Sequence, residues 1–206
     1  MRSDAAERRA RIIRAARHLF AAEGGEVALE AVADAAGVGI ATLYRNFASR
    51  SALADEVVLA ILLDMRAAAA EALADLETDP AQAWTRYVGR LADLDLGAVS
   101  AALTEHVTRD LAAPVREAQE QTLAGVEGVL AAGRRAGLVR DDVAALELVL
   151  ALGLVTRPLP EAIRDAAPDL VPRLLATLLA GMTPGPRPAW LESWSPEPTG
   201  AVPPGT

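Results

Sequence analysis

The side chains of segment 40–47 are of types that recognise DNA, and their spacing places them on one short helix. At helical periodicity, five of them share the side that should face solvent: Ile40, Ala41, Thr42, Arg45 and Asn46. Arginine and asparagine hydrogen bond to base edges and phosphates, and apolar side chains contact the methyl group of thymine. Leu43 and Phe47 lie four residues apart and should face the protein interior. The segment therefore predicts a surface for double-stranded DNA.

The elements around this segment are those that can hold it in place. A helix is expected over 6–23, where apolar residues recur every three or four positions and Gly24-Gly25 ends the pattern. A second helix is expected over 29–36, and the turn Gly37-Val38-Gly39 separates it from the helix over 40–47. Two helices joined by a tight glycine-containing turn can project the second into a major groove. The pattern is that of a helix-turn-helix over 29–48.

The rest of the chain also predicts helices, so the fold class is all-α with about nine helices. Ser49 or Ser51 can begin a long helix that ends near Leu76, and Asp79, Pro80 and Gln82 form a helix start. Further helices are expected over 80–94, 98–111, 114–133 (or to 137), 142–156 with Asp141 as its cap, and 169–181. We expect a DNA-binding domain over 1–50, a helical ligand-binding and dimerisation domain over 51–182, and a proline-rich tail over 183–206.

Charge is distributed unevenly along the chain. The formal net charge is −8, but residues 1–50 contain eight arginines and six acidic residues. The first fifty residues are therefore slightly basic, while the remainder is strongly acidic. This asymmetry indicates one end that faces DNA and a body that phosphates would repel.

Several function classes have no support in the composition and motifs. The chain has no cysteine, so it can form no disulfide or thiolate metal site, and its two histidines lack a paired metal-ligand spacing. It contains no nucleophile motif and no glycine-rich phosphate loop, which argues against an enzyme and against a cofactor. No secretory signal or membrane-spanning apolar run is evident. We expect a cytoplasmic protein, associated with the nucleoid when bound to DNA.

An ordered set of positions resembles the N-terminal domain of TetR-family transcriptional regulators. The set begins with the pattern Ile-Ile-x-Ala-Ala-x-x-Leu-Phe from Ile12 and continues with Gly24 and Val-Ala-x-Ala-Ala-Gly-Val from Val32. It ends with Thr-Leu-Tyr-x-x-Phe-x-Ser-Arg-x-x-Leu from Thr42. The resemblance covers about residues 8–60. It implies a DNA-binding regulator that is not an enzyme.

The resemblance also implies roles for individual residues. Thr42 and Tyr44 match a family pair that touches backbone phosphates and a thymine methyl group, and Arg45 and Asn46 match positions that reach bases or phosphates. Arg50 matches a basic residue that contacts phosphate at the start of the following helix, which an arginine fork can do. The chain departs from the family at Ala28 and Gly39, where hydroxyl residues are common. Each change removes a helix cap, although the backbone N–H groups can still face phosphate.

For the body, the resemblance implies a small-molecule pocket and a homodimer. The pocket residues suggested by sequence are Met65, Trp84, Tyr87, Glu105, His106 and Arg109. Since aromatic residues are scarce, we expect an aliphatic or modestly polar effector. The helices over 142–156 and 169–181 are too apolar to lie exposed and should pair with a second copy, so that two recognition helices bind a palindromic operator. The resemblance further implies a repressor, released when an effector tilts the helix that carries Arg50 and Met65.

Each of these assignments has an alternative that the sequence leaves open. Tyr44 could pack on the helix over 6–23, Ile40 and Ala41 could contact nothing, and Trp84 and His106 could be ordinary interior residues. The two apolar helices could be internal. The arginines of segment 8–17 are expected to form mostly a solvated face, with one or two of them near phosphate.

Two other function classes compete with the regulator. The first is a ligand-binding or scaffold protein whose DNA binding is weakened or lost, for which Ala28 and Gly39 are the evidence. The second is an enzyme that uses Glu105 and His106, for which the pair itself is the only sign. In the proline-rich tail, Trp190 and Trp194 could dock on the body, but a solvated tail without a function fits the composition better.

Overall fold

The computed structural model describes residues 2–23, 27–97 and 112–186, and every regular element in these ranges is a helix. The all-α prediction is therefore confirmed for the described residues. The helices are α1 (Arg2–Glu23), α2 (Leu29–Ala35), α3 (Ile40–Asn46), α4 (Arg50–Asp75), α5 (Pro80–Ala92), α7 (Ala113–Arg135), α8 (Ala145–Val155), α9 (Glu161–Ala166) and α10 (Leu170–Met182). The helix expected over 98–111 and the tail from residue 187 lie outside the described residues.

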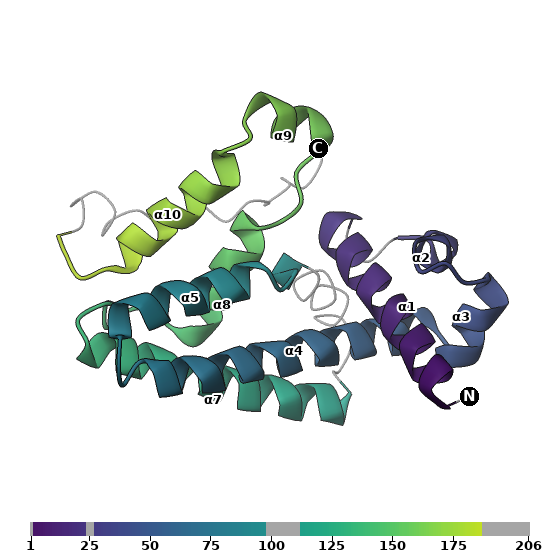
Figure 1. The fold of residues 1–206 in the computed structure, drawn as a ribbon, viewed down its shortest axis with the longest axis horizontal. Coiled ribbons are helices and arrows are strands. Elements are labelled where there is room, and N and C mark those ends of the chain that lie inside the picture. The colour runs from purple at the N-terminus through teal and green to yellow at the C-terminus, as the bar shows by residue number, and fades with distance from the viewer. Residues whose placement is uncertain (1, 24–26, 98–111, 187–206) are drawn as a thin grey trace, which may run out of the picture.

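Helix α4 is the central element of the fold. It packs most extensively on α7 and also contacts α5 and α1, so one helix extends from the N-terminal domain into the body (Figure 1). Its apolar stripe, from Leu53 through Ile61 to Met65, is buried. The Thr122 hydroxyl of α7 donates to Ala118 O at 2.7 Å and lies 3.2 Å from Leu62 O of α4. The α4–α7 pair is thus joined by apolar packing and by a buried polar contact.

The helix starts predicted from the sequence are largely those in the structure. Ser49 Oγ accepts from Ala52 N at the start of α4, and Asp79 Oδ1 accepts from Gln82 N at the start of α5, both at 3.1 Å. These bonds satisfy N–H groups that have no partner within the helix. Helix α8 differs, because it begins at Ala145 and Asp141 does not cap it.

The late start of α8 has a visible local cause. Arg140 Nε pairs with Asp142 Oδ1 at 3.1 Å, which fixes the preceding turn. The Glu147 carboxylate then accepts from Ala144 N, so an acidic side chain within the first turn of α8 supplies the cap. The prediction that Asp141 caps this helix was wrong, because the capping carboxylate is that of Glu147 within the first turn.

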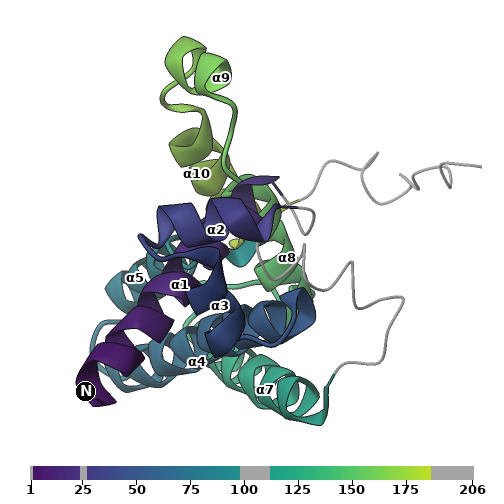
Figure 2. The same cartoon turned by 90° about the vertical axis from the view of Figure 1, so that its right-hand side faces the viewer.

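Helices α9 and α10 project from the rest of the molecule in both views (Figures 1 and 2). Helix α9 was not predicted, and none of its six residues is buried. An element this short without an apolar periodicity leaves no signal in the sequence. Helix α10 packs against α8, and its Met182 is buried. None of the helices in the described ranges is long and apolar enough to cross a membrane.

Candidate nucleic-acid interface

The turn between α2 and α3 sets the angle of the candidate recognition helix. Gly37 has φ +64°, a left-handed conformation that glycine adopts without a steric penalty. Gly37 N donates to Asp34 O, and Val38 N donates to Ala33 O, each at 3.0 Å. This pair of bonds is a Schellman motif, which ends a helix and redirects the chain. The predicted helix-turn-helix is therefore present, with α2 and α3 as its two helices.

Helix α3 has a buried side and an exposed side, as the sequence predicted. Leu43 and Phe47, the residue that follows the helix, are almost fully buried. Tyr44 is 50% exposed. Ala41 and Arg45 are exposed as well, while Ile40, Thr42 and Asn46 are half-buried. Helix α3 thus lies at the molecular surface beside α1 and α2 (Figure 2).

The polar side chains of α3 are held close to their own helix. Arg45 Nε donates to Ala41 O at 3.1 Å, and its Nη2 donates to Thr42 Oγ1 at 3.2 Å. Asn46 Nδ2 donates to Thr42 O at 2.7 Å. The other guanidinium nitrogen of Arg45, Nη1, is not used in these bonds, and the whole residue is exposed. The side therefore presents a preformed cationic group and an aromatic hydroxyl.

The helix starts at Ala28 and Gly39 lack side-chain caps, in line with the sequence. Both residues have extended backbones, and neither makes a side-chain hydrogen bond to its helix. Arg50, at the start of α4, is half-buried, and its guanidinium donates to Val27 O. Arg50 thus joins the segment before α2 to α4, a structural role that the sequence did not predict.

The expected pocket residues divide into two groups. Met65, Trp84 and Tyr87 are all buried in the same core, and the rings of Trp84 and Tyr87 have centroids 6.2 Å apart. Glu105, His106 and Arg109 lie outside the described residues. Within the described part of the chain, Tyr87 Oη is buried without a hydrogen-bond partner. Burial raises the pKa of the Tyr87 hydroxyl well above its usual range, so the group stays protonated and able to donate.

Two of the five arginines in segment 8–17 form ion pairs with α4, which the prediction of a mostly solvated face did not specify. Arg11 and Arg14 are exposed as expected, but Arg9 pairs with Glu56 at 2.7 Å and Arg17 pairs with Asp64 at 2.6 Å. Arg9 precedes buried Ile12 by three residues, and Arg17 precedes buried Phe20 by three. The position of each arginine beside the buried stripe is the signal that could have identified them.

Comparisons with known proteins agree with this geometry. Residues 12–57 match the model of bacterial regulatory proteins of the tetR family, and residues 79–184 match the model of the SbtR-like transcriptional regulator C-terminal domain. The search of curated proteins gave no match.

Among solved structures, a TetR transcriptional regulator from Streptomyces coelicolor is 27% identical, with a TM-score of 0.58 over 85% of this chain and 98% of that one. A TetR regulatory protein from Mycobacterium vanbaalenii is 29% identical, with a TM-score of 0.56 over 89% of this chain and 99% of that one. The ketosteroid transcriptional regulator of Mycobacterium tuberculosis, at 18% identity and a TM-score of 0.57 over 86% of this chain and 96% of that one, shares the fold. The chain therefore belongs to the TetR family of bacterial DNA-binding transcriptional regulators, a family of regulators and not of enzymes.

Proposed function

We propose that the protein is a homodimeric repressor that binds a palindromic operator through α3 and leaves it when a small-molecule effector binds the body. The observation that carries this proposal is the division of α3 into a buried side, with Leu43 and Phe47, and an exposed side, with Tyr44 and Arg45. A helix held in this way can enter a major groove without changing its own packing. We assign the operator contacts to Gly39, Ile40, Ala41, Thr42, Tyr44, Arg45, Asn46 and Arg50.

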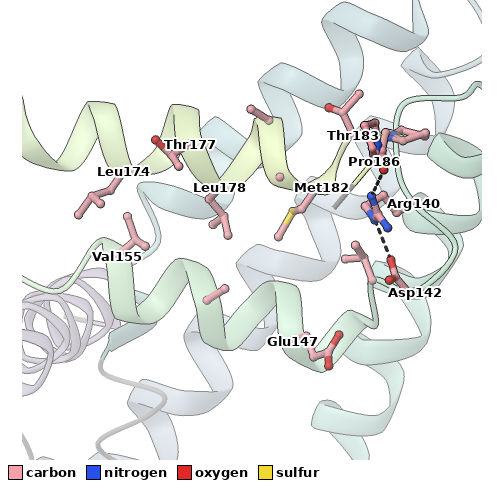
Figure 3. Close-up of a pocket in the computed structure, with 16 residues that line it drawn as sticks. Arg140, Asp142, Glu147, Val155, Leu174, Thr177, Leu178, Met182, Thr183 and Pro186 are labelled. Atoms are coloured by element: carbon pink, nitrogen blue, oxygen red, sulfur yellow. Dashed lines mark hydrogen bonds and ion pairs between the residues drawn. The ribbon is translucent and has the colours of Figure 1, made fainter. Parts of the chain in front are cut away.

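The exposed leucines of α8 and α10 support the dimer. Leu146, Leu150 and Leu154 are spaced by four residues on α8 and all are exposed, as is Leu174 on α10. An open groove of about 970 Å³ lies between the two helices, with Val155, Leu174 and Leu178 along it (Figure 3). Apolar side chains of a second copy would cover this surface. A stable interface of this kind buries about 800 Å² on each partner.

For the effector, the buried hydroxyl of Tyr87 indicates the chemistry, because it has no hydrogen-bond partner among the described residues. A buried hydroxyl without a partner destabilises the free protein, and a ligand that offers a hydrogen-bond acceptor removes that penalty. Met65 and Trp84 supply the apolar surroundings. We therefore propose an aliphatic or modestly polar effector with at least one acceptor oxygen or nitrogen. We also propose that residues 1–50 form the DNA-binding domain and that residues 51–182 form the ligand-binding and dimerisation domain.

Operator selection from random-sequence DNA with the full-length protein tests the proposal. The expected result is enrichment of a palindrome, to which the wild-type protein binds in a gel shift and the Tyr44→Ala/Arg45→Ala variant binds at least tenfold more weakly. If no sequence is enriched, the alternative of a helical ligand-binding protein with lost DNA recognition replaces the regulator. The Arg90→Ala variant is the control, since Arg90 is an exposed arginine of α5.

A further inference from the structure

Arg9 on α1 contacts both α4 and the C-terminal end of α3. Its Nη2 lies 2.7 Å from Glu56 Oε1 of α4, and its Nη1 donates to Asn46 O at 3.1 Å. The guanidinium carbon also lies 4.4 Å from the centroid of the Phe47 ring, a cation–π arrangement. Asn46 O is among the last carbonyls of α3, which have no partner within the helix. Arg9 therefore fixes the end of the recognition helix relative to α1 and α4.

Arg17 makes the same kind of contact at the other end of α1. Its Nη1 lies 2.6 Å from Asp64 Oδ2 of α4, and its Nη2 donates to Leu94 O at 3.1 Å. The Arg17 side chain is only 14% exposed, so water screens this pair less than an ordinary surface pair. Leu94 follows the last residue of α5 by two positions and is itself buried. Arg17 therefore fixes the end of α5 relative to α1 and α4.

The two contacts are in register. From Arg9 to Arg17 the chain advances eight residues along α1, and from Glu56 to Asp64 it advances eight along α4, a rise of about 12 Å on each helix. The two arginines differ in the backbone carbonyl to which they donate. Arg9 donates to Asn46 O at the end of α3, and Arg17 donates to Leu94 O just after α5. Helix α5 carries Trp84 and Tyr87, while α3 carries Tyr44 and Arg45. Helix α1 thus connects the candidate effector site with the candidate operator surface.

The segment after α5 is also closely packed against α1 and α8. A Cβ atom placed on Gly97 would lie 3.5 Å from Ala21 O of α1 and 3.6 Å from Gly153 O of α8. Asp95, two residues earlier, has φ +51°, which is uncommon for a residue with a side chain. The surrounding contacts hold segment 94–97 in this conformation. Segment 94–97 therefore contacts α1 at two points, through Leu94 O and through Gly97.

We infer that Arg17 and Arg9 are positioning residues that couple the end of α5 to the end of α3 through helix α1. This inference rests on the proposed function, because it describes how effector and operator sites communicate. Movement of α5 displaces Leu94 O, and Arg17, which is bonded to it, tilts α1. The tilt of α1 moves Arg9, and Arg9 displaces the end of α3. The route supplements the tilt of α4 and requires no contact between Arg17 and either ligand.

Hydrogen exchange of the free, full-length protein tests the coupling without DNA or effector. We compare wild type with Arg17→Met, Arg17→Lys and the control Arg14→Met, which changes an exposed arginine on the same helix. All these residues have similar helix propensities. Amides of segment 126–133 of α7 serve as an internal reference for global stability.

In Arg17→Met, we expect exchange to rise at least fivefold relative to the α7 reference, both at 91–97 and at 40–47. Arg14→Met should match wild type in both segments. Arg17→Lys retains the cation but has one nitrogen in place of the two with which Arg17 reaches Asp64 and Leu94 O, so it should give a smaller rise. This variant decides the question if Arg17→Met folds poorly. A rise confined to 91–97, with 40–47 unchanged, would mean that Arg17 only stabilises the body and would overturn the inference.

A second variant series and the operator complete the test. Because Arg9 lies downstream on the same route, Arg9→Met/Arg17→Met should raise exchange at 40–47 no more than Arg9→Met alone. If the two substitutions instead raised exchange at 40–47 by factors that multiply in the double variant, they would act independently, which would contradict a common route. On the selected operator, Arg17→Met should bind at least fivefold more weakly than Arg14→Met, and equal binding would overturn the link to DNA. If the wild-type protein selects no operator, the proposed function fails while the exchange data still decide the coupling.

Discussion

Helix α3 and the α8–α10 face are two surfaces that the described part of the chain leaves exposed, and they differ in chemistry. Helix α3 presents Tyr44 and Arg45 to solvent, whereas α8 presents leucines, of which Leu154 is 74% exposed. A cationic and aromatic surface is well solvated in the absence of DNA. A leucine surface is unfavourable in water until something apolar covers it. The α3 surface therefore fits a transient partner, and the α8–α10 surface fits a permanent one.

The same difference implies opposite responses to salt. Binding at α3 releases counterions from phosphate, so its affinity should fall steeply as the salt concentration rises. Association through leucines depends on apolar area and should change little under the same conditions. The two surfaces are nevertheless linked, because a palindromic operator needs two copies of α3 at a fixed separation.

The largest effect is expected from charges placed on the apolar surface. In Leu150→Glu/Leu154→Glu, two carboxylates would be buried against a second copy without partners, so the dimer should dissociate. Operator affinity should fall at least a hundredfold, since each monomer then reads only one half-site. Light scattering during gel filtration measures the mass, and a gel shift measures the affinity.

The matched control for this variant is Leu63→Glu, which changes a leucine that is 57% exposed on α4. It should leave the mass and the operator affinity unchanged. A dimer that survives both α8 substitutions would show that α8 and α10 do not form the interface and would remove the contrast between the two surfaces.

A smaller effect is expected from single substitutions on α3. Arg45→Ala should weaken operator binding about tenfold and reduce the slope of log affinity against log salt by about 2, because each of the two copies in the proposed dimer loses one phosphate or base contact. Tyr44→Ala should weaken binding by a similar factor with little change in slope, since the lost group is neutral. Both variants should remain dimeric, and binding titrations at several salt concentrations measure the slopes. An unchanged slope for Arg45→Ala would place its guanidinium away from the DNA.

The sequence was most informative where the determinants are local. The caps at Ser49 and Asp79 each involve a side chain and an N–H three residues away. Asp79 was predicted, and Ser49 was one of two predicted candidates, beside Ser51. The burial of Leu43 and Phe47 follows from their spacing on one short helix. In these cases the partner lies within one turn, so the local pattern contains all the information required.

The sequence was least informative where a side chain bonds to a distant backbone group. Arg9 donates to Asn46 O, and Arg17 donates to Leu94 O, 77 residues away. Every residue has a carbonyl, so nothing in the sequence marks these two as acceptors. The unpartnered Tyr87 hydroxyl is similar, because the absence of a partner within the described residues becomes visible only once the surrounding core is assembled. The coupling route and the polar group of the effector site therefore required the structure.

An effect of intermediate size is expected from the Tyr87 hydroxyl in the buried core. Tyr87→Phe removes a buried hydroxyl that has no partner in the described structure, so it should stabilise the free protein by about 1 kcal/mol. The melting temperature should then rise by about 2–4 °C for a chain of this length. Any effector that shifts the melting temperature of wild type through this hydroxyl should bind Tyr87→Phe at least tenfold more weakly. A destabilised Phe variant would indicate that the hydroxyl is satisfied.

The pH dependence provides a second measurement on the same variant. Burial raises the pKa of Tyr87 in the folded state, so the folded state holds this proton more tightly than the unfolded chain does. The stability of wild type should be unaffected by this group below about pH 9, where the unfolded tyrosine begins to ionise, and should fall above it. Urea unfolding at pH 8 and pH 10.5 should show a smaller loss of stability in Tyr87→Phe. An equal loss in both proteins would exclude Tyr87 as its source.

The smallest effects are expected at the two uncapped helix starts of the DNA-binding domain. Ala28 is exposed with an extended backbone (φ −63°, ψ 134°), so serine can cap α2 without rearrangement. Ala28→Ser should stabilise the protein by about 1 kcal/mol, whereas Gly39→Ser should add only a few tenths, because glycine is already a tolerable cap. A Cβ at Gly39 meets nothing within 4 Å, so packing does not oppose the change.

Thermal unfolding of the two serine variants measures these differences, and a gel shift on the selected operator measures their effect on binding. If operator phosphates approach the starts of α2 and α3, each new hydroxyl adds a hydrogen-bond donor there, and operator affinity should rise by a few-fold. Stabilisation without any gain in affinity would mean that the missing hydroxyls affect only the helices, and that phosphates do not approach α2 and α3 at their starts. Neither serine should change the mass of the dimer, because the polar surface at α3 and the apolar surface at α8 and α10 are formed by separate sets of residues.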